Sequence, residues 1–346
     1  MSPPRVVTAT AAIVLSVVLA GSVLLAIGLG PAVISPPQTA HYLWAAVSGG
    51  SIGPDEVTTY QIVWQVRTPR VLLAMVVGAG LSAIGVAVQA MVRNALADPF
   101  VLGVSSGASV GAVTVSVLGA FAGFGIHAVS VGAFLGALAA SALVYLASSG
   151  RSGVTPLRMV LTGVVMSFGF QAVMSVIVYF APTSEATSTV LFWSMGSFGA
   201  AAWGSLPVVA ITTGAGIVIL RAFGRSLDVM ALGDETAGSL GIDAARLRRL
   251  LFVLTSIATG AMVAVSGAIG FVGLVMPHLV RLLVGAGHAR VLVVAPLVGA
   301  IFMVWVDLVS RTLVAPRELP LGVITALVGV PVFITLMRRR QHLARR

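Results

Sequence analysis

The chain of 346 residues is 58% hydrophobic and only 9% charged, with a mean hydropathy of +1.08 and a formal net charge of +10. Soluble domains carry roughly 25% charged residues, so this composition excludes a water-soluble fold. The absence of cysteine excludes disulfides and thiolate metal sites. The absence of lysine removes the residue that a phosphate-binding P-loop needs, so we expect no ATP hydrolysis by this chain.

Apolar runs of helical length recur along the whole chain, and a helix needs about 20 such residues to cross a bilayer. Their glycine-rich pattern favours helices over the short alternating strands of a barrel. We therefore predict an all-α, polytopic membrane protein that forms one transmembrane domain over residues 1–346. The predicted spans, about ten, are 8–29, 69–92, 100–119, 127–148, 157–180, 203–221, 248–267, 270–285, 290–312 and 319–337.

The first predicted span also resembles a secretory signal peptide, because a basic N-terminus precedes a long apolar run. We expect it to remain uncleaved, since no small-x-small cleavage site precedes Pro31. Residues 31–66 then form an outer loop, in which Trp44 and Trp64 suit the aromatic belt of a membrane interface.

The arginines orient the spans. With the N-terminus inside, sixteen of the twenty basic residues fall on the inner side, and only Arg67, Arg70, Arg311 and Arg317 fall on the outer side. Cytoplasmic loops accumulate positive charge, so we predict a multi-pass protein of the inner cell membrane with both termini in the cytoplasm. The basic balance thus reflects topology, and nucleic acid is not expected as a partner.

A weak internal repeat links the second and seventh predicted spans. Gly78-Ala79 followed by Gly85 recurs as Gly260-Ala261 followed by Gly267, in spans that run in opposite directions. Inverted repeats are typical of transporters. A single match in a chain with 39 glycines is only a weak signal.

A polar turn, residues 93–99, follows the second span. Asp98 precedes Pro99, a combination that caps and starts a helix. On the residues alone, the turn is either a structural cap or a gate at the cytoplasmic mouth.

The fifth predicted span carries polar groups on one face. Ser167, Gln171 and Ser175 are spaced four residues apart, and Met166 and Met174 lie on a looser stripe. Hydroxyls often bond to their own helix and methionine fills gaps, so packing is one interpretation. The alternative is the lining of a pathway for bulky cargo of mixed polarity.

A polar island from Arg221 to Arg249 interrupts the apolar pattern on the predicted cytoplasmic side. It holds four of the ten acids and five arginines. Leu232 to Gly241 is predicted to be a short helix that starts with Asp234 and Glu235, near the positive end of the helix dipole, and stops at Gly241. A helical loop of this kind, about residues 222–247, favours docking of a soluble partner.

Asp307 is the deepest acid, and Arg311 lies one helical turn after it, so we predict a local ion pair rather than a proton relay. The histidines at positions 41, 127, 278, 288 and 342 have no ligand spacing, and no metal site and no catalytic residue is assigned.

Taken together, these segments resemble the FecCD-type permease subunits of ATP-binding-cassette (ABC) importers, which carry iron–siderophore complexes, haem or cobalamin. The resemblance covers nearly the whole chain. Ala95 departs from it, since the family usually has proline there. The matching motifs are Arg67-Thr-Pro-Arg70, Gly78-Ala79-x-Leu81-x3-Gly85-x3-Gln89, Arg93-Asn94-x-Leu96-Ala97-Asp98-Pro99, Leu102-Gly103-x3-Gly107-Ala108, Trp193-x2-Gly196-Ser197, the Leu232-Gly233 to Leu240-Gly241 loop, Gly270-Phe271-Val272-Gly273-Leu274, Pro277-His278-x2-Arg281 and Glu318-Leu-Pro-x-Gly322.

The resemblance implies ten helices, a second permease copy or homologue, two copies of an ABC ATPase that binds ATP and magnesium, and a substrate-binding lipoprotein. This chain itself would hold no cofactor. The resemblance also assigns roles to residues. Leu232, Gly233, Ala237, Leu240 and Gly241 would contact the ATPase; Arg67, Arg70 and Arg311 would meet acids of the binding protein; Asn94, Leu96, Thr155, Pro156 and Leu157 would form the cytoplasmic gate; Met166, Ser167, Gln171 and Met174 would line the pathway, and segment 187–198 its outer gate.

Three alternatives stay open. An iron–siderophore complex is the first expectation for the cargo, with haem and cobalamin next. A secondary transporter driven by an ion gradient would need paired acids deep in the spans, where only Asp307 is a candidate. A membrane enzyme would need a cluster of His, Asp or Glu at one depth, and the sequence offers none.

Overall fold

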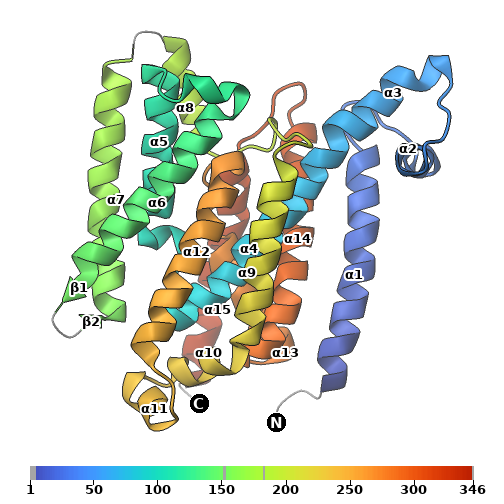
Figure 1. The fold of residues 1–346 in the computed structure, drawn as a ribbon. Helices are drawn as coiled ribbons and strands as arrows, with labels where there is room; N and C mark the ends of the chain where they lie inside the picture. Colours follow the sequence, from blue (N-terminus) through green and yellow to red (C-terminus); the bar gives the residue numbers. More distant parts are fainter. Residues whose placement is uncertain (1–4, 151–152, 182–183, 345–346) are drawn as a thin grey trace.

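The computed structural model describes residues 5–150, 153–181 and 184–344, and these ranges are helical apart from turns and one small hairpin. The hairpin pairs β1 (Ser149–Gly150) antiparallel with β2 (Gly153–Val154). The main helices form an elongated bundle (Figure 1). They are α1 (Arg5–Gly28), α4 (Thr68–Met91), α5 (Val104–Leu118), α6 (Ala128–Ser148), α7 (Pro156–Tyr179), α9 (Leu206–Ala222), α12 (Ala244–Ser266), α13 (Val272–Val284), α14 (His288–Thr312) and α15 (Leu321–Ala344).

Among the described residues, 6 helices are long and apolar enough to cross a membrane by themselves. A seventh span is possible if α9 and α10 (Gly224–Ala231), bent by 63°, count as one. Three shorter apolar helices, α5, α13 and the first part of α15, complete the set. The prediction of an all-α polytopic membrane protein is confirmed.

Two predicted spans begin later than expected, because residues with positive φ interrupt the helix. A single 3-10 turn (Pro99–Leu102) ends at Gly103, with a φ of 79°, before α5 starts. Residues 267–271 separate α12 from α13, and Gly267 and Phe271 adopt φ angles of 66° and 68°. Residues other than glycine rarely adopt a positive φ, so the surroundings of Phe271 must hold its backbone in this conformation.

The predicted outer loop is itself largely helical. In α2 (Pro36–Ser48), the Ser35 hydroxyl accepts a hydrogen bond from the backbone of Gln38, Pro36 stands in the first turn, and Gly49 ends the helix with a φ of 72°. A short helix, α3 (Val57–Gln61), then continues through a π-helical turn (Ile62–Arg67) into α4.

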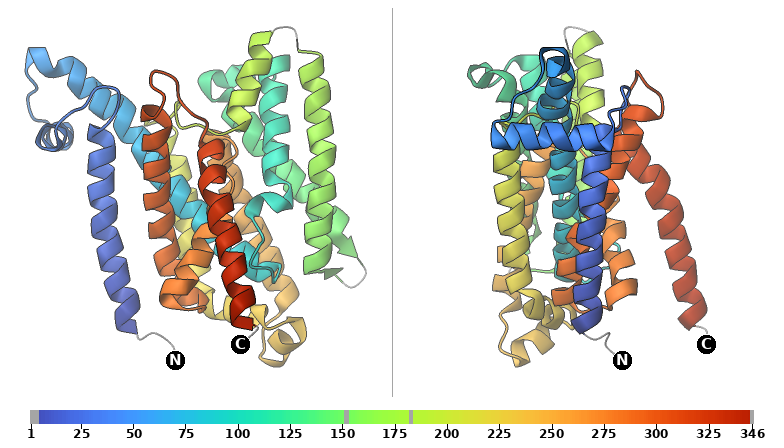
Figure 2. Two further views of the ribbon diagram at one scale, coloured as in Figure 1. Left: turned by 180° about the vertical axis from the view of Figure 1, so that it is seen from behind. Right: turned by 90° about the vertical axis from the view of Figure 1, so that its right-hand side faces the viewer.

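α4 lies at the centre of the bundle, and its glycines allow close helix contacts. A Cβ on Gly78 would collide with the carbonyl oxygen of Gly299 in α14, and one on Gly85 with that of Gly273 in α13. Small residues let membrane helices approach in this way. α7 and α1 lie at the two edges of the bundle (Figures 1 and 2). Of the most apolar stretch of each helix, only 11% is buried within the chain for α7 and 22% for α1.

The two ends of the bundle differ. The start of α1, the end of α15, the hairpin and α11 (Asp234–Ser239) lie at one end, while α2, α3 and α8 (Ser184–Ser194) lie at the other (Figures 1 and 2). The arrangement agrees with the predicted order of inner and outer loops.

Candidate functional site

The polar island forms two short helices at the end of the molecule that also holds the start of α1 and the end of α15 (Figure 1). Asp234 and Glu235 occupy the first turn of α11, where the helix dipole favours acids. Gly241 follows α11 with a φ of 79°, which glycine adopts without strain. The short helix predicted for this loop is therefore confirmed, with its start and its stop.

The tip of this loop exposes two leucines. Leu232 is 67% exposed and Leu240 is 60% exposed, one on either side of α11. Gly233 is half-buried and Gly241 is exposed. Ala237 differs from the prediction, because its side chain is fully buried within the chain and cannot reach another protein. We name the loop from Leu232 to Gly241 the coupling loop, after the ATPase contact that the resemblance implies for it.

Polar contacts fix α10 and α11 to three other segments, which are α12, β2 and α14. Arg248 of α12, buried, donates to Asp234 at 2.7 Å and to the carbonyl oxygen of Val154 in β2 at 3.1 Å. Asp228 of α10 accepts from the backbone N–H of His288 at 2.9 Å, and its carboxylate lies 2.6 Å from the imidazole Nδ1 of that residue. A force on the loop would therefore reach α12, α14 and the turn before α7.

The predicted gate turn touches the coupling loop. Arg93 has a φ of 53°, an unusual backbone conformation for a side chain of this size. Its guanidinium Nη1 lies 3.4 Å from where a Cβ on Gly233 would stand. Gly233 has a φ of 119°, so both residues of this contact are held in conformations that L side chains rarely adopt.

Asn94 and Leu96 are exposed in this turn, and the Asn94 amide oxygen accepts from the backbone N–H of Leu96 at 2.9 Å. In the other predicted gate segment, Thr155 caps α7 by accepting from the backbone N–H of Arg158 at 3.4 Å, and Leu157 is 68% exposed. The buried Pro156 stands in the first turn of that helix.

Asp98 caps the turn as predicted, accepting from the backbone N–H of Phe100 at 2.9 Å. The backbone N–H of Phe271 also donates to this carboxylate. Burial raises the pKa of Asp98 to about 6, while the two backbone donors act in the opposite direction. The carboxylate links the gate turn to the non-helical segment before α13.

Replacing Asp98 by asparagine is expected to stabilise the protein at pH 8. Because the pKa of Asp98 is raised in the folded protein, the folded protein still binds a proton at pH values where the unfolded chain, with a pKa near 4, has lost it. The free energy of unfolding therefore falls as the pH rises from about 4 to above 6. At pH 8 the buried charge of Asp98 lowers the free energy of unfolding by at most about 3 kcal/mol, at about 1.4 kcal/mol per pKa unit. Asparagine keeps the accepting oxygen without the charge.

Thermal unfolding of the purified protein at pH 5 and pH 8 measures this effect. The unfolding temperature of Asp98→Asn should exceed that of the parent protein mainly at the higher pH. A parent protein that is equally stable at both values would contradict the argument.

The three arginines that were predicted to dock the binding protein lie inside the protein, contrary to that prediction. Arg67, Arg70 and Arg311 are 5%, 7% and 5% exposed. Arg67 donates to the carbonyl oxygens of Ile27 and Gly28 at 3.1 and 2.8 Å, and to that of Ala32. The side chains are committed to their own chain, so they are not available to acids of another protein, and we withdraw them as docking residues.

The partners of Arg70 and Arg311 are acids of the same chain. Arg70 Nε lies 2.8 Å from Asp307, and its two terminal nitrogens bind Glu318 at 2.6 and 3.0 Å. Arg311 lies 3.3 Å from the second oxygen of Asp307 and donates to the carbonyl of Ala26. The predicted Asp307–Arg311 pair is confirmed. The sequence near Asp307 did not indicate its second partner, Arg70, which lies 237 residues away.

A groove of about 400 Å³ runs beside α7 and contains three of the four predicted pathway residues, Ser167, Gln171 and Met174. Met166 is not among its lining residues. The Ser167 hydroxyl lies 2.8 Å from the carbonyl of Gly163 and 3.3 Å from the hydroxyl of Ser106. The pathway role stays a proposal, and α5 contributes serines to the groove that the sequence did not single out: Ser105, Ser106 and Ser109.

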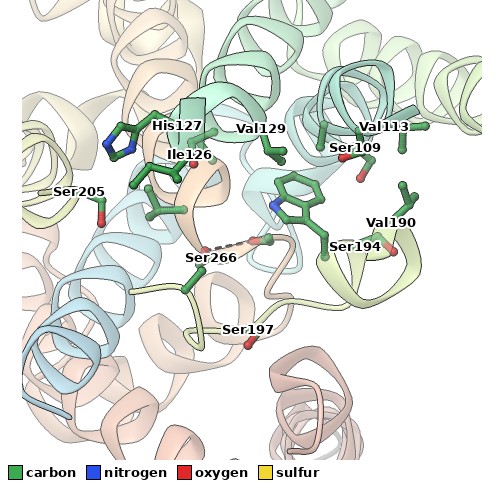
Figure 3. A pocket seen from close by; sticks show the side chains of 18 of the residues that line it. Ser109, Val113, Ile126, His127, Val129, Val190, Ser194, Ser197, Ser205 and Ser266 are labelled. Carbon is green, nitrogen blue, oxygen red and sulfur yellow. Dashed lines mark hydrogen bonds between the residues drawn. The ribbon is translucent and has the colours of Figure 1, made fainter. Parts of the chain in front are cut away.

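A second cavity, also about 400 Å³, shares Ser109 and Ser194 with this groove, and Figure 3 shows the side chains that line it. Trp193 and seven serines contribute to its wall, and we name it the serine pocket. Its serines are Ser109, Ser116, Ser130, Ser194, Ser197, Ser205 and Ser266.

No group of three or more His, Asp or Glu side chains that could hold a metal ion occurs in the part of the chain that the structure describes. The described lining of the groove and the pocket offers hydroxyl groups, the Gln171 amide, the His127 imidazole and aromatic surface.

Comparison with known proteins matches this chain to a family of transport proteins and to permeases of ABC transporters. Residues 17–339 match the model of the FecCD transport family. The chain is 40% identical over 328 residues to an ABC transporter permease protein of Bacillus subtilis, YvrB, covering 94% of this chain and 92% of that protein. It is 36% identical over 323 residues to the molybdate import permease MolB of Haemophilus influenzae, covering 93% and 94%.

A solved ABC transporter assigned to the metal-chelate type, in an inward-facing conformation, superimposes with a TM-score of 0.82 at 33% identity, covering 95% of this chain and 98% of that one. Further relatives of 37–39% identity carry names for import of Fe(3+)-citrate in Bacillus subtilis, hemin in Yersinia pestis and vitamin B12 in Vibrio cholerae. The fold and these matches agree: the chain belongs to the FecCD transport family and is a permease subunit of an ABC importer, not itself an enzyme.

Proposed function

We propose that this permease carries an iron–siderophore complex across the inner membrane into the cytoplasm. Relatives are named for import of Fe(3+)-citrate and hemin, and the described residues that line the groove beside α7 include no Asp, Glu or Arg. Haem, cobalamin and molybdate are the alternatives among the relatives.

The observation that carries the mechanism is the coupling loop, which exposes two leucines on a rigidly anchored polar segment. We propose that the importer contains two permeases and two copies of an ABC ATPase, and that the ATPase binds the coupling loop of each permease. ATP and magnesium bind to the ATPase and not to the permease. A binding lipoprotein delivers the cargo to the outer end of the permease. Both termini lie in the cytoplasm in this proposal, because the coupling loop shares one end of the bundle with the start of α1 and the end of α15.

The mechanism then consists of conformational change. Closure of the ATPase dimer moves the coupling loop, and differential binding shifts the permease between outward- and inward-open states. Arg93 against Gly233 transmits that movement to the gate turn with Asn94 and Leu96, while Thr155, Pro156 and Leu157 form the gate segment at the start of α7.

The structure gives no support to an ion-driven mechanism. Asp307 contacts both Arg70 and Arg311, so this deep carboxylate is already neutralised within the chain. A proton or sodium carrier would need an acid that can release its partner and reach water.

Reconstitution tests the proposal. Proteoliposomes that hold the permease with its cognate ATPase and binding protein should take up a radiolabelled ferric siderophore only when ATP is enclosed with the ATPase. A Walker-motif variant of the ATPase is the matched control and should abolish uptake. Uptake driven by a proton or sodium gradient without the ATPase would refute the proposal.

A further inference from the structure

An apolar groove lies between the N-terminal helix and the C-terminal helix. Its wall is formed by α1, the start of α13, α14 and α15, which are neighbours on one side of the bundle (Figure 2). At about 430 Å³ the groove falls in the size range of ligand-binding cavities. We name it the α1–α15 groove, and its wall includes Leu15, Val298, Trp305, Val328 and Val332.

The wall of this groove is suited to hydrocarbon. Its described residues include no Asp, Glu, Arg or His. The Trp305 indole N–H already donates to the hydroxyl of Ser22 at 3.1 Å, and the buried Thr325 hydroxyl donates to the carbonyl of Gly322 at 3.1 Å. A polar ligand would lose its hydrogen bonds to water here without replacing them, which is costly. The groove therefore favours an apolar chain.

Contacts within the chain define both sides of the groove. The Trp305–Ser22 hydrogen bond joins α14 to α1 on one side. On the other side α15 approaches Phe271 at Gly329, where a Cβ would lie 2.7 Å from the ring. The ring of Phe271 is itself positioned by a backbone φ of 68°, which residues other than glycine rarely adopt. The shape of the groove thus does not depend on a partner.

The groove lies at membrane depth. α1 and α14 are each long and apolar enough to cross a bilayer. Leu15 lies about 15 Å along α1 from Arg5, and Val332 lies about 9 Å along α15 from Arg338. Half of the hydrocarbon core of a bilayer is about 15 Å thick. An acyl chain that starts at the membrane surface near these two arginines therefore reaches the groove.

The charge at that end of the bundle is positive. Arg5 begins α1, and α15 carries the run Arg338-Arg339-Arg340 near its C-terminal end, where the Arg338 side chain is exposed. The first acid of the chain is Asp55 and the last is Glu318, so neither helix contains a carboxylate. A basic cluster next to a membrane-spanning helix attracts anionic phospholipids, by roughly fivefold in affinity per arginine. This end complements a phosphate headgroup.

We infer that the α1–α15 groove binds one acyl chain of an anionic phospholipid, whose headgroup lies at the arginines near the ends of α1 and α15. A second copy of the chain fits less well, because it would bring the same arginines to the same end of the bundle, where like charges repel. The phospholipid supplies both the hydrocarbon and the opposite charge. The inference goes beyond the proposed transport function and holds for any cargo.

Native mass spectrometry of the delipidated permease–ATPase complex tests the site. After addition of phosphatidylglycerol, each permease should retain one lipid molecule. Phosphatidylcholine, whose headgroup has no net charge, should bind at least roughly tenfold more weakly. Equal retention of the two lipids, or retention of neither, would overturn the inference.

A substitution in the wall tests the acyl-chain contact. Val298→Phe places a larger side chain in the groove and should weaken retention of phosphatidylglycerol roughly tenfold. Val17→Phe is the matched control, since Val17 is 69% exposed on α1 outside the described wall, and it should retain the lipid. Unchanged lipid retention in Val298→Phe, or loss of the second permease in place of the lipid, would contradict the assignment.

A change of charge tests the headgroup contact without altering the groove. The triple variant Arg338→Gln, Arg339→Gln, Arg340→Gln should weaken phosphatidylglycerol binding at least roughly tenfold and leave phosphatidylcholine binding unchanged. Arg317→Gln is the control, because Arg317 is an exposed arginine at the opposite end of the bundle. This variant also decides the question if Val298→Phe does not fold. An equal loss of both lipids, or of neither, would refute the headgroup contact.

Tryptophan fluorescence of the same complex provides an independent readout. Trp305 lies in the wall of the groove and is 42% exposed. Phosphatidylglycerol with brominated acyl chains quenches a tryptophan that it contacts, so quenching should saturate near one lipid per permease. Trp305→Phe should remove the saturable part of the signal and leave the gradual quenching of the other tryptophans. Quenching that never saturates, or that persists unchanged in Trp305→Phe, would overturn the inference.

Discussion

Replacing Asp307 by asparagine is expected to lower the free energy of unfolding by about 3–5 kcal/mol, because it leaves buried arginines without their counter-charge. Asp307 is fully buried and contacts both Arg70 and Arg311, whose side chains are 9% and 5% exposed. Removing one partner of such a cluster is far more costly than removing an exposed ion pair. Thermal unfolding in detergent and the yield of folded protein from membranes measure the loss.

A milder variant keeps this test informative if Asp307→Asn does not fold. Glu318 binds the same arginine but its side chain is 40% exposed, so Glu318→Gln should cost less and leave a measurable folded protein. The matched control is Asp243→Asn. Asp243 is exposed, its pair with Arg246 spans 3.8 Å, and asparagine caps a helix as well as aspartate does. Wild-type stability in Asp307→Asn would contradict the role of the cluster.

Leu240→Asp is expected to abolish coupled transport while leaving the permease folded. The side chain is 60% exposed at the tip of the coupling loop, so a carboxylate there is tolerated by the isolated chain. In a groove of an ATPase the same carboxylate would be buried without a partner, which costs several kcal/mol and corresponds to a loss of at least about a hundredfold in assembly. ATP-driven uptake and co-purification of the ATPase measure the effect.

Leu240→Met is the control, since methionine keeps the apolar volume and should retain most transport. Leu232→Asp, on the other side of α11, should reproduce the defect. Stoichiometric co-purification of the ATPase with Leu240→Asp, together with normal uptake, would exclude this loop as the contact.

The docking prediction failed for a physical reason. The resemblance implied that these arginines lie at the surface, where arginine usually lies unless it is paired. Here Arg70 is paired with acids 237 and 248 residues away, and Arg67 with backbone carbonyls at the end of α1. Neither kind of partner leaves a pattern in the neighbouring sequence. Arg317, by contrast, remains exposed at that end.

The sequence by itself determined the features that depend on near neighbours. Apolar runs located the helices, the arginine distribution ordered the loops, and local capping rules found the Asp98 turn and the start and stop of α11. The Asp307–Arg311 pair was accessible for the same reason, since four residues make one helical turn.

Only the tertiary structure decided what segments far apart in the chain make together. It joined Arg70 to Asp307 and Glu318 and placed Arg93 beside Gly233. It also buried Ala237, which was predicted to contact the ATPase. It also gathered the serine pocket from four separate segments. Hydropathy and local hydrogen bonding act along the chain, whereas burial and pairing depend on which helices meet, and a single sequence does not specify that by its local pattern.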